Sequence, residues 1–276
     1  SPESVFGDSL SNTIYGHEPR FAPMTLNTLK DVSYDRILQI WKERYANPGQ
    51  FVYYFVGNFD EATLLPLIKK YIASLPKGKA ENWKEVPSYV NGKVTNKFTN
   101  KSETPKAIAF EFWHAPMAYT LENDVLTDAA GQVLSMVYLK SIREDAGAAY
   151  SVSASGTLRR LGNNSTVIMQ AYCPMDPEKA DLAVNLLAEG MKDNIVKMDA
   201  DKVQKVKDLM LKNADLSAKN NSYWMGILND YIWTGVDSHT NYKKTVEAIT
   251  PAKLAAHLKQ IVAAGNHAEV VMTPAK

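Results

Sequence analysis

The sequence predicts an α/β or α+β protein, and three observations support this fold class. In residues 121–155, apolar side chains at helical spacing give way to the alternation of a strand. Residues 165–173 are then expected to pair with residues 150–157 as an antiparallel hairpin around a Gly-Asn-Asn turn. Finally, a capped helix, a short break and an apolar strand occur at 31–59 and again at 249–274. Such a repeat indicates two related domains, the first present only as its C-terminal part.

The composition is typical of a globular chain with one large domain or two ordinary ones. The 276 residues include 31 basic and 30 acidic side chains, a net charge of +1. No polybasic run is present, so nucleic acid and anionic membranes are poor candidates as partners. No apolar run approaches the length of a membrane span. Because the sequence starts with Ser1 rather than Met, we expect a processed or truncated chain.

The first part of the chain is expected to contain three helices and one strand. Residues 1–12 predict a short helix, followed by a loop at 13–28 that Gly and Pro residues break. A second helix is expected to begin at the N-cap Ser33. The apolar run FVYYFV at 51–56 predicts a strand covered on both faces, and Asp60 is then expected to cap a third helix.

A polar stretch at 77–92 predicts a linker between a partial domain, 1–76, and a complete one, 93–276. The second domain is expected to open with strands at 93–98 and 107–113. Its long helix, 121–142, leads into the hairpin described above, and Pro174 is expected to close the second strand of that hairpin. Asp176 predicts a helix N-cap with Pro177 at the first helical position, and a further helix is expected to start after Asp199.

The helix-to-strand corner between residues 142 and 152 is the candidate functional site. Gly147 is expected to stop the helix, because glycine tolerates the left-handed conformation that ends many helices. Arg143 and Tyr150 flank this corner, and both side chains can donate hydrogen bonds to one carbonyl or carboxylate. The alternative interpretation is that Arg143 is a solvated charge at the helix end and Tyr150 a half-buried strand aromatic.

The sequence predicts no metal site and no self-sufficient catalytic centre within this chain. None of the five histidines has another histidine three or four residues away, so zinc-peptidase spacings are missing. The single cysteine, Cys173, cannot form an internal disulfide, and we interpret it as a small buried thiol. A chain without disulfides fits the cytoplasm and equally a bacterial periplasmic protein, and of the two we favour the bacterial periplasm. The histidines are His17, His114, His239, His257 and His267.

The run LKSIREDAGAAYSVSAS resembles the R-x-x-x-x-[GA]-x-Y-[SA]-V signature in the C-terminal half of pitrilysin/insulinase-type zinc peptidases (inverzincins). The loop YGHEPRFAP is similar to the family pattern Y-G-x-H-P-Y-x-x-P, although Glu18 separates His17 from Pro19. YANPGQ, YFVGNF and ASLP also match segments of the family, so the resemblance covers nearly the whole chain. The departures are the alanines at 148 and 149, where many members have Gly or Leu, and the altered His17 loop.

This resemblance implies a pitrilysin-like, metallohydrolase-like fold: antiparallel or mixed sheet covered by helices on one face, plus a partial copy of the same domain. Residues 1–76 then correspond to the end of the third domain of a single-chain member, and residues 93–276 to the whole fourth domain. The family's zinc site lies in its first domain, so zinc is expected in the full-length protein and outside this chain. Matched residue by residue, the resemblance implies that Arg143 and Tyr150 are the pair expected to reach across a peptide chamber to the substrate at that zinc site.

Physically, a phenol and a guanidinium are suited to this role, because a tetrahedral oxyanion needs hydrogen-bond donors. The expected partners are a peptide or small-protein substrate and the N-terminal half of the same polypeptide, or a catalytic partner subunit. The fragment alone is expected to be inactive, and the full-length protein to be a zinc metalloendopeptidase. Two alternatives remain open: a non-catalytic scaffold or binding subunit, and an unrelated α+β domain with a chance match. An H-x-x-E-H motif upstream would distinguish peptidase from scaffold.

Overall fold

A five-stranded mixed sheet organises the chain in the computed structural model, which describes residues 1–78, 89–101, 103, 105–161 and 164–275. The strands lie in the order β1-β5-β2-β4-β3. The β1 and β5 strands are parallel, and the other neighbouring pairs are antiparallel. The strands are β1 (Lys93–Asn100), β2 (Ala107–Pro116), β3 (Ser153–Leu161), β4 (Asn164–Met175) and β5 (Asn266–Pro274). The predicted hairpin is therefore confirmed as β3–β4, although Pro174 lies inside β4 rather than beyond its end.

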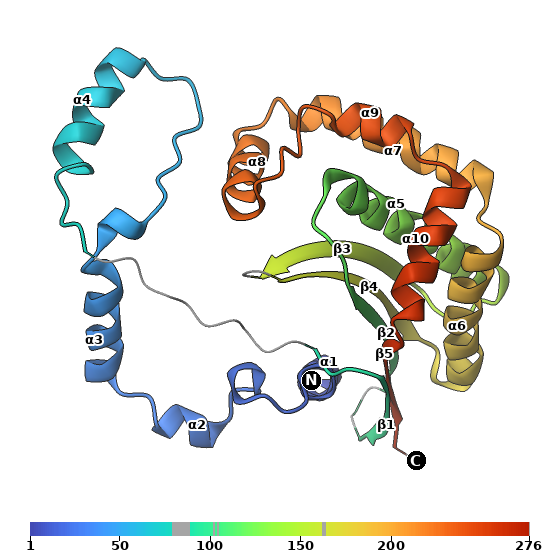
Figure 1. Cartoon of the computed structure of the whole chain (residues 1–276). Helices are drawn as coiled ribbons and strands as arrows, with labels where there is room; N and C mark the ends of the chain where they lie inside the picture. Colours follow the sequence, from blue (N-terminus) through green and yellow to red (C-terminus); the bar gives the residue numbers. More distant parts are fainter. Residues whose placement is uncertain (79–88, 102, 104, 162–163, 276) are drawn as a thin grey trace.

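Helices cover one face of this sheet and build the main core against it (Figure 1). Alternate strand residues such as Ala109, Val167 and Met169 point into this core, where they meet Val133 and Leu258. In the described residues, no helix is long and apolar enough to cross a membrane. The helices after β2 are α5 (Leu121–Tyr138), η3 (Leu139–Asp145), η4 (Pro177–Lys179), α6 (Ala180–Val196), α7 (Ala200–Ser217), α8 (Asn221–Thr234), α9 (Tyr242–Glu247) and α10 (Pro251–Ala263).

A single N-terminal helix, α1 (Pro2–Tyr15), lies against the opposite face of the sheet (Figure 1). The side chain of Ser1 caps this helix. Phe6 is buried among β2 and β5 side chains that include Ile108, and Ile14 is buried in a second cluster around Phe112. The N-terminal helix α1 therefore packs on the sheet that residues 93–276 form.

The remainder of the N-terminal segment lies away from the sheet (Figure 1). Ser33 and Asp60 cap their helices as predicted. The predicted strand at 51–56 does not form, and most of its apolar side chains are exposed, with Val52 at 52% and Phe55 at 41%. A strand needs a neighbouring strand for its backbone hydrogen bonds, and the described residues offer it none. The elements here are η1 (Pro19–Phe21), α2 (Leu26–Lys30), α3 (Tyr34–Tyr45), η2 (Pro48–Gln50) and α4 (Glu61–Tyr71).

The predicted linker, 77–92, falls mainly on residues 79–88, which lie outside the described part of the chain. Its last residues are attached to α1, because the Val90 amide donates to the Ile14 carbonyl at 2.8 Å. His114 also contacts this segment, with 3.0 Å between its Nε2 and the Val90 carbonyl oxygen. The division into domains at this linker stays a prediction.

Two glycines allow α5 to pack directly on the backbone of β3. A Cβ atom added at Gly131 would lie 2.3 Å from the Gly156 nitrogen, and one added at Gly156 would lie 2.1 Å from the Thr127 carbonyl oxygen. Real Cβ atoms do not approach backbone atoms so closely, so only glycine fits without moving the helix or the strand.

We therefore expect Gly156→Ala to lower the free energy of unfolding by roughly 3 kcal/mol, because overpacking of a rigid backbone contact is costly. Urea denaturation of the purified variant measures this loss. Gly226→Ala on α8 is the matched control, because nothing lies within 4 Å of an added Cβ there. A Gly156→Ala variant as stable as the control would contradict the close packing.

His257 on α10 is buried beside Thr127 of α5, with 2.9 Å between its Nε2 and the threonine Oγ1. The Thr127 hydroxyl donates to the Asn123 carbonyl, so it accepts from the imidazole Nε2–H. Burial lowers the pKa of His257 to about 4, because a second ring proton would place a charge in the core. The neutral form therefore stabilises the fold above pH 6.5, and that contribution is lost as pH falls towards 4.

We expect the stability advantage of the wild type over His257→Gln to shrink by up to about 3 kcal/mol between pH 7 and pH 4. The glutamine amide can still donate to Thr127 but does not titrate. Burial raises the pKa of Asp124 to about 6, which acts in the opposite direction in both proteins. The quantity to measure is thus the difference between the two urea-denaturation profiles, and a pH-independent difference would refute the assignment.

Candidate functional site

The long helix does not end where α5 ends but continues as a π-helical turn, η3, that carries Arg143. The wider turn is visible in the bond from the Ala146 amide to the Ser141 carbonyl, five residues back, at 3.1 Å. Ile142 is fully buried and anchors this turn, whereas Arg143 is exposed. Short π-helical segments inside helices are rare and frequently occur at functional sites.

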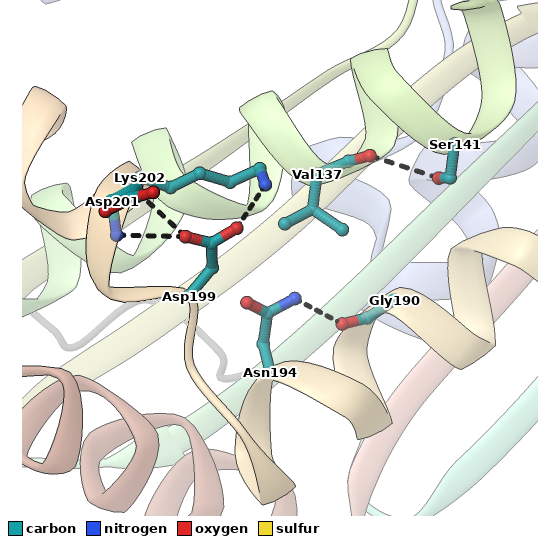
Figure 2. A network of polar contacts seen from close by, with 7 residues as sticks. All are labelled: Val137, Ser141, Gly190, Asn194, Asp199, Asp201 and Lys202. Atoms are coloured by element: carbon teal, nitrogen blue, oxygen red, sulfur yellow. Dashed lines mark hydrogen bonds and ion pairs between the residues drawn. The ribbon is translucent and has the colours of Figure 1, made fainter. Parts of the chain in front are cut away.

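The helix leading into this turn is held by α6. The Tyr138 hydroxyl donates to the Leu187 carbonyl at 2.9 Å, and its ring lies so near Gly190 that an added Cβ would be 2.6 Å away. Figure 2 shows the neighbouring contacts, in which Ser141 donates to the Val137 carbonyl and Asn194 to the Gly190 carbonyl. The same view includes Asp199, which caps α7 through the amides of residues 201 and 202.

The chain leaves the helix through Gly147, which adopts the predicted left-handed conformation with φ of 55°. The Ala148 amide donates to the Ile142 carbonyl at 2.8 Å, and Ala148 and Ala149 are buried beneath the corner. Tyr150 is not yet in a strand, because β3 begins at Ser153. Its side chain is 88% exposed, so the interpretation of Tyr150 as a half-buried strand aromatic is wrong.

The structure brings the two candidate residues together. The guanidinium carbon of Arg143 lies 5.7 Å from the centroid of the Tyr150 ring, a cation–π distance. Both side chains belong to one short corner and both face solvent. A phenol O–H and a guanidinium can therefore be offered to the same acceptor from outside the chain.

The end of β4 and the turn after it hold this corner from the other side. Ala149 forms an isolated antiparallel bridge with Met175, and the Asp176 amide donates to the Ala148 carbonyl at 2.9 Å. Lys179 places its Nζ 3.1 Å from the carbonyl oxygens of both Ala146 and Gly147. Sequence reasoning missed Lys179, because no local pattern links a lysine after Pro177 to a turn some thirty positions earlier.

A hollow of about 520 Å³ opens beside the corner, at the end of the sheet where α1 begins. Its wall combines aromatic and apolar groups with charged side chains. The lining residues are Glu3, Pro105, Lys106, Ala107, Ile108, Gly147, Ala148, Ala149, Tyr150, Tyr172, Pro174, Met175 and Asp176.

The described residues contain no group of three or more His, Cys, Asp or Glu side chains arranged to hold a metal ion. Zinc therefore does not fit the residues present in this part of the chain. The histidines make other contacts: His239 lies 2.7 Å from the Tyr223 hydroxyl, and His267 lies 2.5 Å from the buried carboxylate of Glu111. Burial raises the pKa of the Cys173 thiol to about 12, which agrees with its interpretation as an inert core residue.

Comparisons with known proteins show which family this chain resembles. Residues 31–210 match the family model described as the Peptidase M16 inactive domain. The Arabidopsis thaliana protein "Zinc protease PQQL-like" is 22% identical over 205 residues, 68% of this chain and 21% of that protein. The Bacillus subtilis protein "Uncharacterized zinc protease YmxG" is 28% identical over 157 residues, 55% of this chain and 37% of that protein. The chain thus matches only about a fifth to two fifths of these relatives.

Solved structures show the same fold. The ferredoxin protease FusC, in complex with Arabidopsis ferredoxin, superposes with a TM-score of 0.82 at 19% identity over 100% of this chain and 30% of that chain. The periplasmic protease PqqL from Escherichia coli superposes with a TM-score of 0.81 at 19% identity, over 99% of this chain and 31% of that chain. A peptidase M16 inactive domain from Pseudomonas fluorescens superposes with a TM-score of 0.77 at 14% identity, over 100% of this chain and 66% of that chain.

The family model covers well over half of the chain and includes both Arg143 and Tyr150. The resemblance inferred from the sequence motifs is thereby confirmed, and a chance match with an unrelated domain is excluded. The chain belongs to the Peptidase M16 inactive domain family of zinc proteases.

Proposed function

We propose that this chain is the end of the non-zinc half of a zinc metallopeptidase, and that its corner at Arg143 and Tyr150 acts on bound peptide. In this proposal residues 1–76 complete a third domain, 77–92 form a linker, and 93–276 form the fourth domain. The observation that carries it is the exposed pairing of a guanidinium and a phenol, 5.7 Å from carbon to ring centroid.

The chemistry of this pair suits a peptide carbonyl. As negative charge develops on the oxygen, a neutral phenol and a cationic guanidinium both donate hydrogen bonds to it. Arg143 also carries further N–H donors in a planar fork, which can hold the substrate backbone in register. Tyr150 has a single O–H, so it would donate one hydrogen bond, to the carbonyl oxygen alone.

Zinc would be bound outside this chain, in the part of the full-length protein that precedes it. The described residues supply no ligand group for the metal, so the chain by itself is expected to cleave nothing. Enclosure of the peptide would require the preceding half of the same polypeptide or a separate catalytic subunit. We propose a periplasmic location, supported by the fold likeness to a protease described as periplasmic.

A second candidate function is a non-catalytic scaffold or binding subunit. One observation favours it: a chain of Complex III2 from Candida albicans shares the fold, with a TM-score of 0.70 at 14% identity over 99% of this chain. The two functions differ in what they require of the corner. A scaffold does not need the Tyr150 hydroxyl, whereas the peptidase does.

In the full-length protein, we expect Tyr150→Phe to lower kcat for peptide cleavage by roughly 10²-fold, the effect of losing one oxyanion donor. Zinc content and Tm should stay close to wild type, because the side chain is solvent-exposed and changes little in volume. Steady-state kinetics with metal analysis and a melting curve test this. Tyr231→Phe, an exposed tyrosine on α8, is the matched control and should keep full activity.

Arg143→Ala should raise KM as well as lower kcat, since the guanidinium would also hold the substrate backbone. The same kinetic measurements separate the two constants. A well-folded Tyr150→Phe enzyme with wild-type turnover would end the peptidase role of this corner and leave the scaffold function.

The partial-domain proposal predicts that residues 51–56 become a strand once the preceding chain is present. Hydrogen exchange of their amides should be fast in the 276-residue chain and at least about tenfold slower in the full-length protein, because strand pairing protects amides. Amides of β2 serve as the control and should be protected in both proteins. Equally fast exchange of 51–56 in both would show that this run is not part of a sheet.

A further inference from the structure

The turn between Arg143 and Tyr150 carries two carbonyl groups that its own helix cannot satisfy. The oxygens of Ala146 and Gly147 follow the last π-helical bond, and the last carbonyls of a helix have no intrahelical donor. Lys179 supplies the missing donor, with its Nζ 3.1 Å from each of these oxygens. A cation at the C-terminal end of a helix is also favoured by the helix dipole.

The ammonium group of Lys179 lies close to Gly147 in the turn. A Cβ added at Gly147 would lie 3.6 Å from its Nζ. Lys179 lies in η4, the turn that follows β4, and Asp176 caps the start of η4. The same turn is tied to the corner through the bond from the Asp176 amide to the Ala148 carbonyl. Loss of the ammonium contact would therefore loosen the backbone that separates Arg143 from Tyr150.

We propose that Lys179 is a positioning residue for the Arg143–Tyr150 corner. Its ammonium fixes the backbone of residues 146 and 147, and this turn sets where the phenol stands relative to the guanidinium. Lys179 itself does not touch the substrate. The inference rests on the proposed function, but its structural part, the immobilised turn, can be measured without any catalysis.

The structural part is tested by hydrogen exchange on the 276-residue chain. Lys179→Met keeps the length of the side chain and removes its donors, so the amides of residues 146–148 should exchange at least about threefold faster. Lys179→Arg keeps donors and should restore slow exchange. Lys192→Met is the control: this exposed lysine lies on α6, roughly 20 Å further along at 1.5 Å per residue. Unchanged exchange in Lys179→Met would overturn the proposal, whatever the function of the corner.

The functional part is tested by a double-mutant cycle in the full-length enzyme. Lys179→Met should lower kcat about fivefold with Tm near wild type, and Lys179→Arg should recover most of that loss. In the Tyr150→Phe background, Lys179→Met should cost nothing more, because it acts only by placing the missing hydroxyl. Additive losses would overturn the positioning role. If Tyr150→Phe alone has no effect, the proposed function fails, while hydrogen exchange still decides whether Lys179 holds the turn.

Discussion

The direct backbone contact between α5 and β3 is the constraint on which the geometry of the corner depends. Gly131 and Gly156 bring the helix and the strand so close that neither can slide past the other. Since Arg143 follows α5 and Tyr150 precedes β3, this contact fixes both ends of the connection between them. The loop itself is short, so little freedom remains for the two side chains except their own rotamers. Rigid elements position such a pair better than a long mobile loop would.

Much of the second domain could be predicted from local patterns. Period and capping located α5, α6, α7 and α10, the Gly-Asn-Asn sequence located the β3–β4 hairpin, and Gly147 has the expected left-handed backbone. The corner was identified from spacing and resemblance alone. Its detailed shape could not be predicted, because a π-helical turn has no sequence signature and the donor on the turn, Lys179, is local only in space. Likewise, nothing in the pattern of α1 indicates that Phe6 and Ile14 pack on a distant sheet.

The run at 51–56 shows why a correct pattern can fail to become structure. Its β-branched and aromatic residues favour a strand, but strand propensity measures how well side chains fit a pleated surface with neighbours. In the described residues that surface is missing, so most of the apolar side chains of this run stay exposed to water. Because contiguous apolar exposure of this kind marks an interaction site, we propose that another segment of the full-length protein covers this run. The short share of each relative that the chain spans, 21% and 37%, agrees with this interpretation.

The exposure of Tyr150 also bears on how the proposed site would work. A phenol that is 88% exposed already donates to water, so a new hydrogen bond to a carbonyl gains little in the open state. The same is true of the guanidinium beside it, whose charge is screened by solvent. Both donors become strong only where water is excluded and the local dielectric falls. In the proposed function, the other half of the protein therefore does more than hold the metal: by closing over the corner, it turns a weak pair of surface donors into an effective one.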